Sequence, residues 1–114
     1  MPDLTRLADD AVQFVTEREW AQFHTVKDLA ISLNLEAAEL LEITQWKDEQ
    51  ALETDPSVTA KLRGELADVL YWLLILSRKT GIDLEEAFAE KMEENRAKYP
   101  VDKARGTSKK YTEL

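Results

Sequence analysis

The sequence predicts an all-α protein, and specifically an antiparallel four-helix bundle assembled into a homo-oligomer. Three observations lead to this fold class. Apolar residues recur at helical spacing in four segments, cap signals bound most of these segments, and no segment alternates polar and apolar residues as a strand would. With 114 residues, the chain suits one domain with a single core, at a size where association adds useful burial.

The first helix is expected from Asp3 to about Arg18. Its inward residues recur every three or four positions: Leu4, Leu7, Ala11, Phe14 and Val15. Residues 19–24 have no clean period and form a connector. The second helix is expected from Val26 to about Trp46, because Thr25 and Asp28 have the form of a capping box.

Residues 48–54 are polar, and Asp55 followed by Pro56 is a signal for the start of the third helix. That helix is expected from about Ser57 to Thr80 and ends at Gly81. A fourth helix opens at residues 83–86, with Leu84, Ala87, Phe88 and Met92 facing inward. It ends near Tyr99, before Pro100. We therefore expect a domain over 1–100 and a polar, basic C-terminal arm over 101–114.

Charge narrows the possible partners. The formal net charge is -8, which argues against a nucleic-acid polymer because duplex binders need a basic footprint. Seven basic and three acidic residues fall between 91 and 110, so a basic segment follows an acidic body. The chain has no cysteine, no signal-peptide pattern and no apolar run of membrane-spanning length. We expect a cytoplasmic protein that does not enter a membrane.

An internal repeat organises the chain. Residues 33–41 and 62–70 both read L-x-x-E-x-A-[ED]-[LV]-L. On a helix of about 100° per residue, each copy carries two acids on one flank of a leucine stripe that is expected to face the core. The stripe includes Leu33, Leu40 and Leu41 in the first copy and Leu62, Leu66, Val69 and Leu70 in the second. The pairs are Glu36 with Glu39 and Glu65 with Asp68.

If the two repeats pack together, four carboxylates converge where repulsion and desolvation oppose ionisation, and a bound cation would offset both. Carboxylate oxygens select Mg²⁺, or Mn²⁺ in its place, over zinc. Di-iron bundles pair Glu with a His three residues on, and the single histidine of this chain lies in a connector. The alternative is an acidic face exposed to solvent, on which the spacing of the acids is due to chance. The repetition of the acid pairs and the apolar residues around them favour a metal site.

Two further groups of residues can contact a ligand. Lys91, Asn95 and Lys98 fall along one side of the fourth helix, where they can donate to phosphate oxygens. Taken alone, these cations are more typical of a helix C-terminus. Aromatic residues for stacking a flat base include Trp20, His24, Trp46 and Trp72. Trp46 and Trp72 continue the acid flanks, whereas aromatics at helical spacing are more often core.

Three segments together resemble the signatures of the all-α nucleoside triphosphate pyrophosphohydrolases, the MazG-like superfamily: residues 36–46, 65–70 and 91–100. Residues 18–24 further resemble its dCTP pyrophosphatase branch. The resemblance implies Mg²⁺-dependent hydrolysis of a nucleoside triphosphate to monophosphate and pyrophosphate by a homo-oligomer, a tetramer or else a dimer.

By position, the resemblance makes Glu36, Glu39, Glu65 and Asp68 metal ligands, and makes Lys91 and Asn95 phosphate contacts. Trp20, His24 and Trp46 match the nucleobase pocket. One departure is Trp72, which stands where the branch has a tyrosine and bears on base selectivity.

The expected reaction needs no protein nucleophile. Water attacks the α-phosphorus as pyrophosphate leaves, and Glu39, beside Glu36, accepts its proton. The expected substrate is dCTP or a related pyrimidine deoxynucleotide. The alternatives are a nucleotide-binding module without hydrolysis and a helical oligomerisation module.

Overall fold

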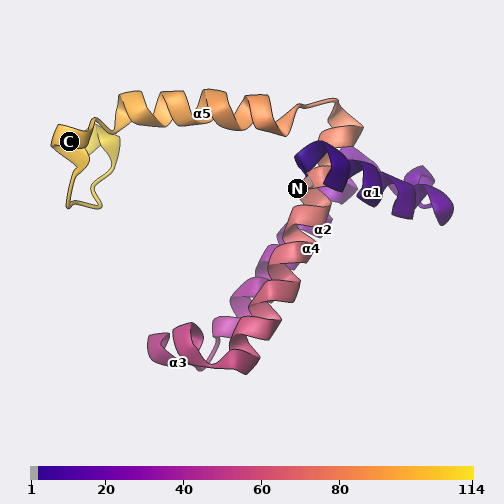
Figure 1. Cartoon of the computed structure of the whole chain (residues 1–114), viewed down its shortest axis with the longest axis horizontal. Helices are drawn as coiled ribbons and strands as arrows, with labels where there is room; N and C mark the ends of the chain where they lie inside the picture. The colour runs from indigo at the N-terminus through magenta and orange to yellow at the C-terminus, as the bar shows by residue number, and fades with distance from the viewer. Residues whose placement is uncertain (1–2) are drawn as a thin grey trace. The chain divides into compact units, whose positions relative to one another are not determined.

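The computed structural model describes residues 3–114, and this part of the chain is helical with no strand. The elements are α1 (Leu4–Glu17), η1 (Ala21–Phe23), α2 (Val26–Thr44), α3 (Glu49–Thr54), α4 (Pro56–Thr80), α5 (Leu84–Lys98), α6 (Val101–Ala104) and η2 (Tyr111–Glu113) (Figure 1). The all-α prediction is confirmed. Among the described helices, none combines the length and apolar character needed to cross a membrane.

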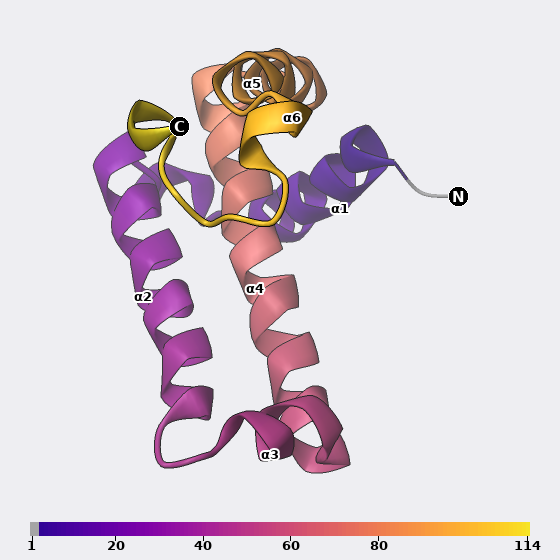
Figure 2. The same ribbon diagram turned by 90° about the vertical axis from the view of Figure 1, so that its left-hand side faces the viewer.

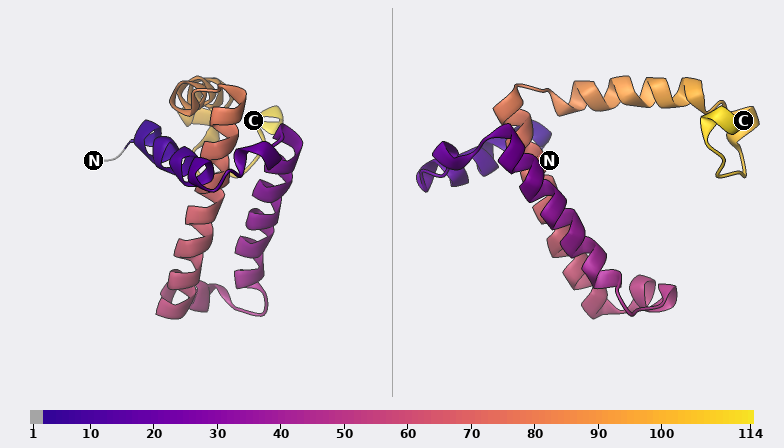
Figure 3. Two further views of the ribbon diagram at one scale, coloured as in Figure 1. Left: turned by 90° about the vertical axis from the view of Figure 1, so that its right-hand side faces the viewer. Right: turned by 180° about the vertical axis from the view of Figure 1, so that it is seen from behind.

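The chain forms two units, divided between Ile82 and Asp83. In the first unit, α2 and α4 run antiparallel and side by side (Figure 2). Helix α1 packs on α4, and α3 packs near the start of α4, where it joins the ends of the α2/α4 hairpin (Figure 3). The core of this unit gathers Ala11, Val15, Leu29 and Ile75. Asp9 of α1 accepts a hydrogen bond of 2.7 Å from Arg78 of α4.

Side-chain caps fix the helix ends where the sequence predicted them. Thr25 accepts from the Asp28 amide at 3.0 Å, and Asp55 accepts from the Ser57 amide at 2.9 Å with Pro56 in the first turn. Gly81 closes α4 in the left-handed region at φ 73°, which glycine adopts without steric cost. Helix α3 was not predicted, although Asp48 caps it by accepting from the Ala51 amide at 2.8 Å.

The packed faces of α2 and α4 contain only one edge of the leucine stripes that were expected to form the core. The residues of α2 that are buried or half-buried include Leu29, Leu33, Glu36, Leu40 and Ile43. Those of α4 include Val58, Leu62, Glu65, Val69 and Trp72. Glu36 and Glu65 therefore lie within the contact faces, whereas Leu41 and Leu66, on the other edge of each stripe, are 69% and 57% exposed. For these two leucines, the expectation of burial within the chain is wrong.

The second unit contains α5 and the segment after it. Phe88 of α5 was expected to face inward and is 69% exposed. After α5 the chain forms α6 and η2, and Tyr111 returns to the end of α5. The centroids of the Tyr111 and Tyr99 rings are 6.0 Å apart, and the Lys98 ammonium lies 4.9 Å from the centroid of the Tyr111 ring. The basic arm thus has local structure, while a domain boundary between 100 and 101 stays a prediction.

Candidate functional site

Three carboxylates from the two repeats meet between α2 and α4. Glu36, Glu65 and Asp68 each offer an oxygen, and these oxygens all lie within 4.8 Å of one another. Glu36 and Glu65 are half-buried, and Asp68 is exposed. The antiparallel pairing produces this convergence, because it brings equivalent turns of the two repeats to the same level of the hairpin.

Two oxygens of this cluster have no partner within the described chain. Glu36 Oε2 and Glu65 Oε2 are both buried, and neither accepts a hydrogen bond. A buried carboxylate oxygen without a donor is costly, and a shared proton or a cation would relieve the cost. An all-oxygen donor set suits Mg²⁺ or Mn²⁺. The residues present therefore fit a hard divalent cation.

Glu39 belongs to the same cluster. Its carboxyl lies close enough to Glu36 to share a proton, and this contact, together with the charges of Glu36 and Glu65, raises the pKa of Glu39 to about 7. The pKa of the Glu65 carboxyl is also raised, chiefly by its burial and then by its contact with Glu36. The metal-free site therefore holds a proton more readily than separate carboxylates would.

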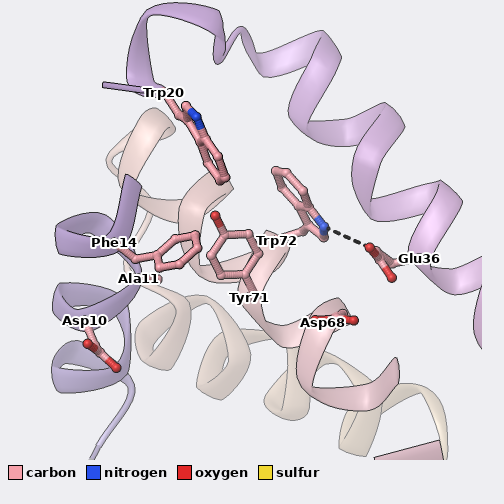
Figure 4. A pocket seen from close by; sticks show the side chains of 8 residues that line it. All are labelled: Asp10, Ala11, Phe14, Trp20, Glu36, Asp68, Tyr71 and Trp72. Carbon is pink, nitrogen blue, oxygen red and sulfur yellow. Dashed lines mark hydrogen bonds between the residues drawn. The ribbon is translucent and has the colours of Figure 1, made fainter. Parts of the chain in front are cut away.

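An aromatic pocket with a volume of about 440 Å³ opens beside the cluster (Figure 4). Its lining consists of Asp10, Ala11, Phe14, Trp20, Glu36, Asp68, Tyr71 and Trp72. The rings of Phe14 and Trp20 are 5.6 Å apart, and those of Tyr71 and Trp72 are 4.9 Å apart, both edge to face. Because Glu36 and Asp68 line the pocket as well, a flat ligand bound among the rings would have its polar end at the acids.

Trp72 connects the pocket to the cluster. Its indole Nε1 donates a hydrogen bond of 3.4 Å to Glu36 Oε1, drawn as a dashed line in Figure 4. Phe14 and Asp10 were not among the predicted site residues. Phe14 was assigned to the inward face of the first helix. Helical spacing alone does not show that this face ends at a pocket.

The other predicted contacts lie elsewhere. The His24 ring is 6.1 Å from that of Trp72 but lines a different cavity, on the α1 side of Leu29. Trp46 is 94% exposed and has a left-handed backbone with φ 63°. Lys91 and Asn95 lie on α5 in the second unit, where Lys91 forms an exposed ion pair of 2.9 Å with Glu94. The roles predicted for these residues stay predictions.

A helical chain with converging acid pairs beside an aromatic pocket has clear relatives. The model of the MazG-like family matches residues 31–114, and the chain belongs to this family. It is 40% identical over 119 residues to dCTP pyrophosphatase 1 of Rattus norvegicus and 39% identical over 117 residues to that of Homo sapiens. Each match covers all of this chain and 67% of the relative.

A solved structure resembles the chain as well. The crystal structure of a pyrophosphatase from Archaeoglobus fulgidus DSM 4304 has a TM-score of 0.78 and 38% sequence identity. The match covers 88% of this chain and 94% of that one.

Proposed function

We propose that this chain is a nucleotide pyrophosphohydrolase that converts dCTP, or a related pyrimidine deoxynucleoside triphosphate, to its monophosphate and pyrophosphate with Mg²⁺. The supporting observation is that Glu36 and Asp68 line the aromatic pocket and also belong to the acid cluster. One ligand can therefore have a flat ring in the pocket and phosphates at the acids. The names of the relatives point to dCTP.

Glu36, Glu39, Glu65 and Asp68 would hold the cation, with Mn²⁺ as a substitute for Mg²⁺. A bound divalent cation supplies charge stabilisation at the phosphate oxygens. Glu39 is the residue suited to accept a proton from the attacking water, because it is a carboxylate in contact with Glu36 at the acid cluster. Glu36 would hold Glu39 in position through this contact.

The base would stack on the rings of Trp20 and Trp72, which line the pocket. Stacking on the indoles gives contact area and shape for any flat base. Selectivity between bases needs hydrogen-bond donors and acceptors at the edge of the base. His24 is the candidate for this selectivity because its ring lies against Trp72. Trp46 would contact the base only if another copy of the chain brings it to a pocket.

A homo-oligomer, a tetramer or else a dimer, would cover the exposed apolar face of the hairpin. On antiparallel helices, equivalent positions of the two repeats lie on the same side of the pair. The exposed members of this side include Val26, Leu41, Leu66, Leu70 and Leu73. Two hairpins joined by these faces would form the four-helix bundle, so we assign the bundle to a pair of copies.

Hydrolysis distinguishes this proposal from its alternatives. With Mg²⁺, the purified chain should release pyrophosphate from dCTP faster than from dTTP, dATP or dGTP. A binding module would show an Mg²⁺-dependent thermal shift with nucleotide but no pyrophosphate, and an oligomerisation module would show neither. The net charge of -8 favours a free nucleotide over a nucleic-acid polymer, and the proposed place of action is the cytoplasm.

A further inference from the structure

A second cavity, of about 530 Å³, adjoins the acid cluster. Its lining consists of Glu39, Glu42, Ile43, Lys47, Ala60, Lys61, Gly64 and Glu65. The aromatic pocket takes Glu36 and Asp68 from the cluster, whereas this cavity takes Glu39 and Glu65. On α2, Glu39 lies closer than Glu36 to the C-terminus of the helix, and on α4, Glu65 lies closer than Asp68 to the N-terminus. The second cavity is therefore nearer to the α3 end of the hairpin. The acid cluster therefore lies between an aromatic pocket and a cavity that contains two lysines.

The two lysines are available to a ligand. Within residues 3–114, neither Lys47 nor Lys61 takes part in an ion pair. The pKa of Asp55 is lowered chiefly by the hydrogen bonds that it accepts from Ser57 and, to a smaller extent, by the charge of Lys47. That carboxylate is already used to cap α4. The left-handed backbone at Trp46 turns the chain directly before Lys47, which follows the last turn of α2.

We propose that Lys47 and Lys61 bind the β- and γ-phosphates of the substrate, and then the pyrophosphate product, in this cavity. The inference rests on the proposed function and adds a direction to it. The base lies at Trp20 and Trp72, the α-phosphate at the acids, and the two outer phosphates toward α3. Asp68 and Lys61 are seven residues apart on α4, which is a rise of about 10 Å, so Lys61 lies beyond the acids in the direction of α3.

The chemistry of the leaving group supports this placement. The attacking water forms a new oxygen–phosphorus bond at the α-phosphorus, its proton goes to Glu39, and the bond from the α-phosphorus to the bridging oxygen breaks. Negative charge then grows on the departing pyrophosphate. Ammonium groups placed there stabilise that charge, and lysine is a compact cation with three donors that suits phosphate oxygens.

The test measures binding of inorganic pyrophosphate with Mg²⁺ by titration calorimetry, in the full chain. The variants are Lys47→Gln, Lys61→Gln and the double variant, with Lys61→Arg to retain the charge. Lys27→Gln, an exposed lysine at the start of α2, is the matched control. Melting curves check that each variant folds.

The double variant should bind pyrophosphate at least 10-fold more weakly than the control, which corresponds to about 1.4 kcal/mol. It should bind dCMP unchanged, and Lys61→Arg should retain most of the affinity. Inorganic phosphate in a parallel titration should show a smaller loss, because one phosphate can remain at the acid cluster alone. If the double variant and Lys27→Gln bind pyrophosphate equally, the inference is wrong. If the wild type binds pyrophosphate but releases none from dCTP, the proposed function fails instead.

Discussion

The indole nitrogen of Trp72 donates to Glu36 across the interface of α2 and α4 at 3.4 Å. This bond satisfies one oxygen of Glu36 and leaves Oε2, which has no partner within residues 3–114, as the oxygen that we propose binds a cation. A donor to a metal ligand orients that ligand for the metal, and the indole would do so for Glu36.

Trp72→Phe should therefore weaken divalent binding while keeping an aromatic ring in the pocket. Loss of a partner of this kind typically costs about 10-fold or more in metal affinity. Mn²⁺ titration followed by electron paramagnetic resonance measures the change without relying on turnover. Tyr71→Phe is the control, because Tyr71 lines the same pocket and, within residues 3–114, donates to none of the acids. Equal affinities in the two variants would contradict the role of the indole.

Glu39→Gln and Asp68→Asn should abolish turnover and leave the helical fold intact. Removing a general base typically costs about 10²–10⁴-fold in rate, and either change removes a predicted metal ligand. Without metal, Glu39→Gln should raise the melting temperature, because it removes one of the carboxylates that repel each other in the cluster. Pyrophosphate release and circular dichroism follow the two effects. If both variants stay active, the assignment of the acids is wrong.

The metal-free chain should lose stability as pH rises from about 4.5 to about 7. The pKa of Glu39 is raised from 4.5 to about 7 in the folded chain, so the folded state binds more protons than the unfolded state across this interval. Stability falls with pH wherever the folded state holds the extra proton. Melting curves across this range, with chelator, test the slope. Glu39→Gln should flatten the slope, and Mg²⁺ should reverse it because cation binding displaces the proton.

Leu66→Glu should break the oligomer. Leu66 is 57% exposed on the apolar face of the hairpin, and a buried unpaired carboxylate at an interface is strongly unfavourable. Analytical ultracentrifugation should show a smaller species at micromolar concentration. The same change at Val101, an exposed apolar residue of α6, should leave the assembly unchanged. A wild-type chain that sediments as a monomer would refute the oligomer itself.

Trp46→Asn should raise KM for every base while leaving the fold at least as stable. Base stacking on an aromatic ring is worth about 1–3 kcal/mol, so KM should rise at least about 5-fold. Asparagine tolerates the left-handed backbone that Trp46 adopts better than tryptophan does, and Trp46 is almost fully exposed within the chain. Steady-state kinetics with four nucleotides give the result. In contrast, His24→Gln should change mainly the ranking of the bases.

Local signals predicted much of this fold, because caps act over a few residues. Thr25, Asp55 and Gly81 were each identified from their neighbours, and the structure has all three at the ends of helices. Helix α3 was missed because its six residues are too few to show a period. The convergence of the acids was expected from their spacing, and the oxygens of Glu36, Glu65 and Asp68 do meet.

Other features depend on which face of a helix meets which neighbour, and periodicity does not determine that. The leucine stripes and the acid flanks are adjacent on each helix, and the structure turns α2 and α4 so that Glu36 and Glu65 face the partner helix. Pocket residues such as Phe14 depend on the crossing of α1 over α4, which no local pattern encodes. The two lysines of the second cavity come together only once the hairpin has formed.

The position of Glu36 and Glu65 inside the packed faces has a consequence for how this protein can change over generations. A leucine at either position would fill the same space and remove a buried charge, so a screen that rewards only folding would favour it. Variants enriched in such a screen would be more stable and inactive. On the proposed function, selection for catalysis is what keeps the acids, and a lineage released from that selection would be expected to lose them early and keep its helices.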